Sequence, residues 1–282
     1  MDSLCYDLPG MSPVGLGLIA LLNTPGTTVK QIAVQAELDP AIFGNIVGCA
    51  NSPAYTGLNK STDILASLLR LGQREVRRIV FQVVLRGAFH HESQPISTIL
   101  RRIWLQSLAT NVSMHKLTAA ASESFALDQE EARFAECLGL LHNIGYLVLL
   151  ANFPHRFLDF FSRHEDLPLP AFFDQEQRWF HPHDHFSCGR AVLEVWNFPR
   201  SFSEIVAGYK EPAGEFRGSH PRLHGMLRLS RHAISMTEYA FHPVQPDGFW
   251  MEGAELPDGQ PDFSTLIPDV RQSVQHVEAS FS

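Results

Sequence analysis

The sequence predicts an all-α fold, and three observations support this prediction. Apolar residues recur at helical spacing along most of the chain. No stretch shows the repeated strict alternation of apolar and polar residues that is typical of half-buried strands. Apolar residues make up 45% of the 282 positions, which is enough to build a sizeable core. We therefore expect a globular helical protein.

Short helices with clear boundary signals fill residues 1–95. Thr28 with Gln31 has the pattern of a capping box, and Asp39 precedes a proline that suits the first helical position. Gly72 is expected to end or bend a helix in this part. The expected helices run from Pro13 to Leu22, from Thr28, from Pro40 to near Asn51, from Ser61 or Thr62 to Gly72, and on through Val84.

Longer helices are expected after Pro95, which we take as a boundary between two subdomains. Asp128 with Glu131 should cap the helix that holds His142 and Asn143. The expected helices cover about 98–122, 128–150, an aromatic-rich segment after Pro170, 185–197, a segment from Pro199, and 221–240. We thus predict one domain over 1–240, with subdomains 1–95 and 96–240. An arm follows over 241–282, rich in proline and glycine, with a short terminal helix near Asp269 to Ala279.

Charge and composition limit the classes of partner. The formal net charge of −8 disfavours nucleic acid and anionic membrane surfaces, which attract basic proteins. No window approaches the run of about 20 apolar residues that spans a bilayer, and the start Met1-Asp2-Ser3 lacks the positive region of a signal peptide. The four cysteines are scattered, as expected for reduced thiols. We expect a cytoplasmic protein whose partners are proteins or small ligands.

The segment Leu140-Leu141-His142-Asn143-Ile144-Gly145 is the most informative motif. It resembles the Leu-Leu-His-Asp-Ile-Gly stretch of HD phosphohydrolases, in which the adjacent His and Asp bind a metal that activates water. Asn143 replaces the carboxylate with a neutral amide, whose oxygen is a weaker ligand for a divalent cation.

Separated segments in a fixed order together resemble the HDOD family, a bacterial signalling module related to the HD phosphohydrolases. The segments are Leu8-Pro9, Pro13, Asp39-Pro40-Ala41, Ala50-Asn51-Ser52, Leu71-Gly72, Trp104 with Ser107, residues 140–145, Asp184-His185, Gly189, Trp196 and Pro199. The resemblance implies a multi-helix N-terminal subdomain packed on a second, HD-like helical subdomain.

The resemblance also assigns the former metal positions. The first ligand falls on Gln106, the His-Asp pair falls on His142 and Asn143, and a later His falls on His185. A distal His-rich stretch falls on Gly208-Tyr209-Lys210. Only two imidazoles remain, whereas zinc sites use three or four protein ligands. We therefore expect no bound metal, no cofactor and no catalytic residue, although Glu176 and Asp184 are potential oxygen ligands for a rebuilt site.

Three other groups have both a functional and a structural interpretation. The cluster His181-Pro182-His183-Asp184-His185 is either a metal site or a loop in which Asp184 caps a helix. Four aromatic residues are either pocket walls or core. Four arginines at helical spacing are either a solvated face or a surface for a protein partner. The aromatic residues are Phe172, Phe173, Trp179 and Phe180, and the arginines are Arg70, Arg74, Arg77 and Arg78.

Together these features indicate a non-catalytic signal-transduction module that acts through protein contact or a small ligand, including a nucleotide. The alternative is a divergent metal-dependent phosphohydrolase acting on nucleotides or cyclic dinucleotides through His142 and His185. Metal content separates the two hypotheses, because only the second requires an ion that is lost when His142 is replaced.

Overall fold

The computed structural model describes residues 13–24, 26–52, 55, 60–88, 92–120, 127–196, 198–242, 248–253 and 262–280. The described residues are helical without strands, so the predicted all-α fold is confirmed. The N-terminal motif residues Leu8 and Pro9 and most of the linker over 241–261 lie outside them. The helices are α1 (Pro13–Asn23), α2 (Val29–Ala36), α3 (Pro40–Ala50), α4 (Ile64–Ala88), α5 (Gln94–Ala120), α6 (Gln129–Leu141), α7 (Ile144–Asn152), α8 (Pro154–His164), α9 (Leu169–Phe180), α10 (His185–Val195), α11 (Arg200–Gly208), α12 (Pro221–Ser235) and α13 (Phe263–Ser280).

The predicted caps of α2 and α3 are confirmed. Thr28 Oγ1 accepts a hydrogen bond from the Gln31 backbone N–H, and Gln31 Oε1 accepts one from the Thr28 N–H at 2.8 Å. Asp39 Oδ1 accepts from the N–H groups of Ala41 and Ile42, at 2.9 and 3.1 Å. These bonds satisfy amides that have no partner within a helix, which explains why α2 and α3 begin where the sequence indicates.

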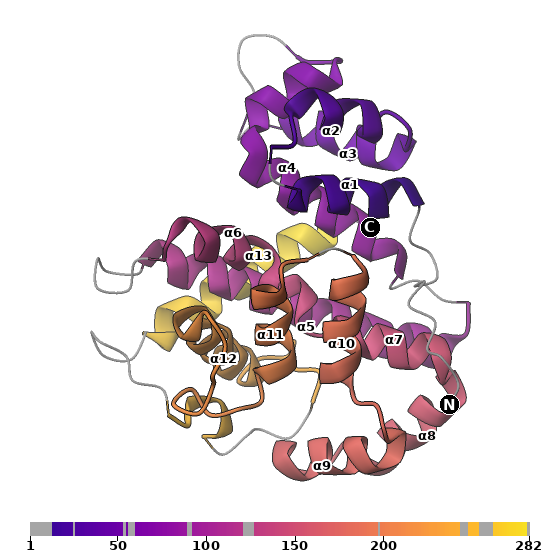
Figure 1. Ribbon diagram of the computed structural model, residues 1–282, viewed down its shortest axis with the longest axis vertical. Coiled ribbons are helices and arrows are strands. Elements are labelled where there is room, and N and C mark those ends of the chain that lie inside the picture. Colours follow the sequence, from indigo (N-terminus) through magenta and orange to yellow (C-terminus); the bar gives the residue numbers. More distant parts are fainter. Residues whose placement is uncertain are drawn as a thin grey trace.

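Helices α1 to α4 form one group, drawn at the top of Figure 1, and α4 reaches from it toward α6. Helix α4 bends at Gly72, where φ is +75° and ψ is 162°, as the sequence predicted. This backbone conformation is costly for residues with a Cβ atom, so glycine permits the change of direction. The bend separates Arg70 from the three arginines that follow.

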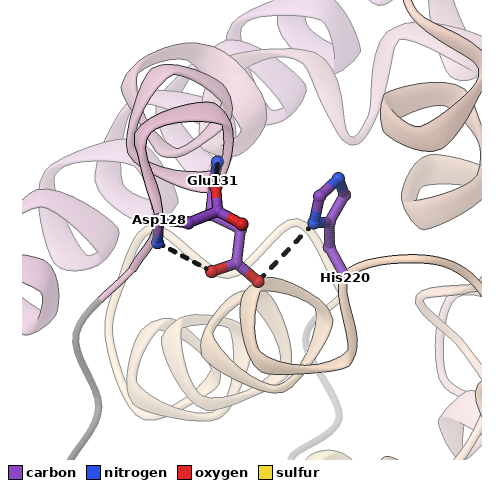
Figure 2. Close-up of side chains that lie close together, drawn as sticks. All are labelled: Asp128, Glu131 and His220. Atoms are coloured by element: carbon purple, nitrogen blue, oxygen red, sulfur yellow. Dashed lines mark hydrogen bonds and ion pairs between the residues drawn. The ribbon is translucent and has the colours of Figure 1, made fainter.

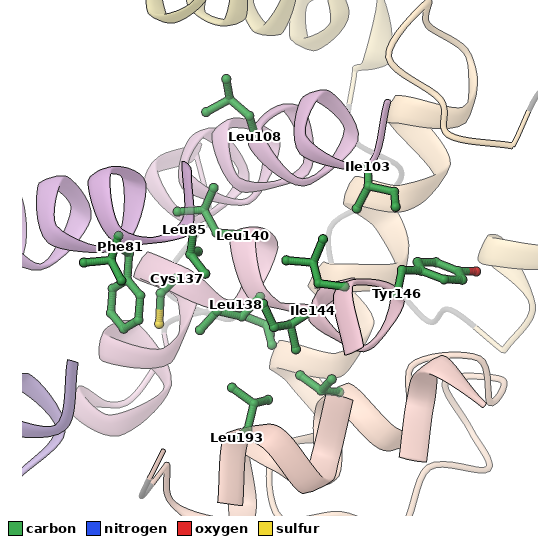
Figure 3. Packing of buried hydrophobic residues seen from close by; sticks show 14 of the residues in the cluster. Phe81, Leu85, Ile103, Leu108, Cys137, Leu138, Leu140, Ile144, Tyr146 and Leu193 are labelled. Atoms are coloured by element: carbon green, nitrogen blue, oxygen red, sulfur yellow. The ribbon is translucent and has the colours of Figure 1, made fainter. Parts of the chain in front are cut away.

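A continuous apolar core connects α4 with the later helices (Figure 3). Phe81 of α4, Leu138 of α6, Ile144 of α7 and Leu193 of α10 are each at most 1% exposed. Burial of such side chains contributes roughly 1.5–3 kcal/mol each. The core therefore fixes α6, α7 and α10, the helices that surround the predicted motif.

The structure corrects the expectation that His142 and Asn143 lie inside a helix. They form the turn between α6 and α7, and the Tyr146 N–H donates to the Asn143 carbonyl at 3.0 Å. The apolar pattern runs through this break, so periodicity alone does not reveal it. No single described helix is long and apolar enough to cross a membrane, but Cys137–Asn152 and Pro154–His164 meet that standard as a pair bent by 119°.

The terminal helix is longer than predicted. Helix α13 begins at Phe263 rather than near Asp269, and Pro268 lies inside it. The Asp262 side chain accepts from the Ser264 N–H at 2.9 Å, which caps the new start. Val270 and Val274 are fully buried, and α13 packs against α5. This burial offsets the backbone hydrogen bond that Pro268 does not make.

Candidate functional site

Four of the former metal positions are joined in one buried chain of hydrogen bonds. Asn143 Nδ2 donates to Gln106 Oε1 at 2.7 Å, and the Tyr209 hydroxyl donates to Asn143 Oδ1 at 3.1 Å. His185 Nε2 lies 2.8 Å from the same hydroxyl, and His185 Nδ1 lies 2.8 Å from both carboxylate oxygens of Glu176. All five side chains are at most 2% exposed. The structure thus brings the predicted positions together and adds Glu176 at the end of the chain.

The direction of these bonds defines which groups donate and which accept. With Gln106 and Asn143 oriented as in the structure, the Tyr209 O–H donates to Asn143 and its oxygen receives a proton donor from His185. The other ring nitrogen of His185, Nδ1, is hydrogen-bonded to the carboxyl group of Glu176. The chain is thus hydrogen-bonded without a break from Gln106 to Glu176. Glu176 also accepts from the His185 backbone N–H at 2.6 Å, which ties α9 to the start of α10.

His142 lies beside this chain rather than within it. Its Nδ1 donates to the Gly139 carbonyl at 2.7 Å, so Nε2 keeps its lone pair, and no described residue hydrogen-bonds to Nε2. Its ring packs edge-on against Tyr209, with 5.4 Å between ring centres. Burial lowers the pKa of His142 well below its ordinary value, and the positive charge of Arg231 lowers it further. His142 is therefore a neutral imidazole with one unused acceptor.

Helix α12 and the 3₁₀ helix η2 (Phe249–Met251) close the site, which the sequence did not predict. Trp250 is fully buried, and its ring stacks on Tyr209 at 5.9 Å between centres. The guanidinium of Arg231, 5% exposed, lies 4.9 Å from the centre of the Trp250 ring. Arg228 donates to the backbone carbonyls of Tyr209 and Lys210. Residues 221–235 carry an arginine on their apolar face, and this sequence signal could have indicated that the helix packs over a buried polar site.

Two contacts hold the site in place, one between two backbones and one between a side chain and a backbone. A Cβ atom at Gly145 would lie 1.8 Å from the His185 carbonyl oxygen, so α7 and α10 touch through their backbones there. His224 Nε2 donates to the Gly208 carbonyl at 3.1 Å, and its ring stacks on Phe216. These contacts position Tyr209 and His185 against the turn that carries Asn143.

We expect stability to fall in acid because of His224. Burial lowers the pKa of His224 from 6.5 to about 4, so the unfolded chain takes up a proton that the folded chain refuses. The contribution of His224 to the free energy of unfolding should be fully present above about pH 6.5. It should fall by roughly 3 kcal/mol as the pH approaches 4.

The replacement His224→Gln, whose amide can donate to the same carbonyl, should flatten this fall in urea unfolding measured from pH 7 to 4. His155→Gln, at an exposed position on α8, should unfold like the unaltered protein. Identical pH profiles for His224→Gln and the unaltered protein would contradict the assignment.

The His-rich turn and the aromatic residues have structural roles in the described chain. Asp184 Oδ1 accepts from the Ser187 N–H at 2.7 Å, so Asp184 caps α10 as the structural interpretation predicted. His181 is exposed, whereas His185 points inward to Glu176. Phe172 and Phe180 are 1% exposed and pack against Phe160 in the core.

The four arginines do not form one face. Arg70 donates to the Ala50 carbonyl at 3.2 Å, and Arg74, which is exposed, bonds to His115. Arg77 is 6% exposed and donates to Asn23 Oδ1 at 3.0 Å and to the Leu22 carbonyl. Arg78 pairs with Glu75. Arg70, Arg74 and Arg77 thus link α4 to α3, α5 and α1, whereas Arg78 pairs within α4.

Asp128, Glu131 and His220 form the one described group of three potential metal ligands whose atoms lie within 4.8 Å of one another (Figure 2). Glu131 Oε2 accepts from the Asp128 N–H at 3.1 Å, and Asp128 Oδ1 accepts from the Glu131 N–H at 2.8 Å. This is the predicted capping box of α6. Glu131 also lies 3.6 Å from His220 Nδ1, which links the starts of α6 and α12. These bonds account for the cluster as a helix cap.

A family model matches most of the chain. Residues 8–212 match the model of the HDOD domain. The chain belongs to the HDOD family. The HDOD match ends before α12, so α12 and η2, which cover the buried polar chain, lie beyond the matched residues, as does α13. No curated protein matches the sequence.

Solved structures share this HDOD fold at low sequence identity. An HDOD domain protein of unknown function from Geobacter sulfurreducens is 17% identical, with a TM-score of 0.67 over 97% of this chain and 92% of that chain. A candidate phosphohydrolase from Shewanella amazonensis is 18% identical, with a TM-score of 0.66 over 94% and 91%. A candidate signal transduction protein from Marinobacter aquaeolei is 18% identical, with a TM-score of 0.68 over 96% and 60%.

Proposed function

We propose that this HDOD protein is a non-catalytic regulatory module that transmits a signal through contact with a protein or a small ligand. The observation that carries the proposal is the Tyr209 hydroxyl, which bonds both Asn143 and His185. It supplies the partner that a metal ion would otherwise supply to these two side chains.

The donor set does not suit a divalent metal. Gln106 and Asn143 offer neutral amide oxygens, and each is used in a hydrogen bond within the chain. Glu176, the carboxylate in the chain, is held by His185. Among the described former metal positions, Nε2 of His142 is the nitrogen that keeps an unused lone pair, and a single imidazole is too few ligands for zinc or iron. A satisfied polar network of this kind fixes helix packing without an ion.

The alternative, a divergent phosphohydrolase, is favoured by one specific observation. The buried His142 Nε2 has no hydrogen-bond partner among the described residues, as a ligand awaiting an ion would. Metal-dependent chemistry at this site would require Tyr209 to move away from Asn143 and His185. Loss of two buried hydrogen bonds opposes this movement by about 2–3 kcal/mol.

A hydrolysis assay tests the proposal. We expect no turnover of bis(p-nitrophenyl) phosphate, 5′-AMP or cyclic di-GMP with added Mn²⁺ or Fe²⁺, because the oxygen ligands of the buried chain are already used in hydrogen bonds and do not suit a metal that activates water. The control is the same preparation of His142→Ala. Metal-dependent turnover that disappears in His142→Ala would establish the alternative.

We also propose that Arg74 contributes to a surface for an acidic protein partner, since it is the exposed member of the arginine group. Arg74→Glu should abolish copurification of such a partner, whereas Arg217→Glu, an exposed reversal in another part of the chain, should retain it. Equal copurification with both variants would contradict this role.

A further inference from the structure

A cavity of about 360 Å³ lies between the group α1–α4 and the later helices. Its walls come from the end of α1 and the turn that follows, from α4, from α6, and from the segment between α10 and α11. Small-molecule sites in proteins measure roughly 300–1,000 Å³, so this volume suits a metabolite of mononucleotide size or smaller. It is separate from the buried chain of Gln106, Asn143, Tyr209, His185 and Glu176.

Buried apolar residues and polar residues together line the cavity. The apolar residues include Leu22, Phe134, Cys137 and Phe198. The polar residues are Asn23, Thr24, Thr27, Gln73 and Arg77, and most of the accessible surface of the lining is polar. The cavity therefore suits a small polar molecule.

The lining favours a negatively charged ligand. Arg77 contributes a buried guanidinium, and none of the described residues that line the cavity is acidic. Arg77 donates to Asn23 Oδ1 at 3.0 Å and to the Leu22 carbonyl, which fixes its guanidinium beside the end of α1. An anion in the cavity would be attracted by this positive charge.

We propose that this cavity binds a small organic anion, with its carboxylate or phosphate group near Arg77. Such a ligand contacts both groups of helices at once. Helix α6 leads from Phe134 and Cys137 to the turn that holds His142, so the ligand would sit at one end of the element that supports the buried polar chain. The purpose of binding rests on the regulatory function proposed above, whereas binding itself does not.

Two substitutions that preserve size test the proposal. Asn23→Asp keeps the oxygen that Arg77 binds but gives the side chain a negative charge, which offsets the charge of Arg77 and repels an anion. Gln73→Glu adds a negative charge at an exposed position of the lining. The matched control is Gln177→Glu, the same change at an exposed position on α9, which does not line the cavity.

Isothermal titration calorimetry would use 5′-AMP and 4-hydroxybenzoate as anionic probes and adenosine as the uncharged counterpart of 5′-AMP. We expect saturable binding of at least one anion, weaker binding of adenosine than of 5′-AMP if 5′-AMP binds, and a loss of at least about tenfold in affinity in Asn23→Asp and Gln73→Glu. Gln177→Glu should bind like the unaltered protein.

Three results would overturn the proposal: no binding of either anion, equal binding of adenosine and 5′-AMP, or unchanged affinity in both Asn23→Asp and Gln73→Glu. Circular dichroism melting of each variant shows that a loss of binding is not a loss of fold. The outcome is independent of metal content and hydrolysis. A failure to bind these anions would leave the proposed non-catalytic role standing, and a failure of the non-catalytic role would leave anion binding standing.

Discussion

Gly145→Ala is expected to destabilise the protein by more than about 3 kcal/mol, because α7 and α10 meet through their backbones at this position. The added Cβ atom would lie 1.8 Å from the His185 carbonyl oxygen and 2.7 Å from the Gly189 nitrogen. Neither atom belongs to a flexible side chain, so the two helices would have to separate. Their separation would also displace His185 from Tyr209 and Glu176.

The measurement is the free energy of unfolding from urea titration followed by circular dichroism. Gly225→Ala is the matched control, since Gly225 lies inside α12 and nothing lies within 4 Å of its added Cβ atom. Alanine there should stabilise the protein by about 0.5–1 kcal/mol. A Gly145→Ala protein within 1 kcal/mol of the unaltered one would show that the two helices do not approach as closely as described.

Glu176→Ala is expected to cost about 3–5 kcal/mol, because it leaves the buried His185 ring nitrogen and backbone N–H without their partner and opens a cavity. Glu176 and His185 are both fully buried, and the carboxylate binds the His185 ring and its backbone N–H. Glu176→Gln keeps the shape and one acceptor oxygen, so we expect a smaller loss of about 1–3 kcal/mol.

Glu194→Ala provides the comparison, because Glu194 pairs with Arg190 on the surface of α10 with 46% of its side chain exposed. An exposed pair of this kind contributes at most about 0.5 kcal/mol. The free energy of unfolding in urea should therefore be well below that of Glu176→Gln for Glu176→Ala. For Glu194→Ala it should be close to that of the unaltered protein. If Glu176→Ala and Glu194→Ala were equally stable, the buried chain would not hold α9 to α10.

Features that depend on neighbouring residues in the sequence could be predicted. The caps at Thr28, Asp39 and Asp184 follow from side chains that satisfy amides two or three residues later. The bend at Gly72 follows from a backbone conformation that glycine adopts readily. The positions of the former metal ligands came from the family resemblance, and the structure places Gln106, Asn143, His185 and Tyr209 in contact.

Features that depend on distant contacts could not be predicted. The break at His142 and Asn143 is hidden by apolar residues on both sides, since a buried turn and a buried helix have the same composition. Arg77 has the spacing of a surface arginine, but the end of α1 covers it. Trp250 lies in a segment rich in proline and glycine, yet it is buried against Tyr209 and Arg231.

The most direct test of the non-catalytic role is the transition-metal content of the purified, untagged protein, measured by elemental mass spectrometry beside His142→Ala. We predict a folded protein without stoichiometric metal and no difference between the two preparations, because Tyr209 already satisfies Asn143 and His185. Stoichiometric zinc, iron or manganese that disappears in His142→Ala would contradict this account and make the protein a metal-dependent phosphohydrolase candidate.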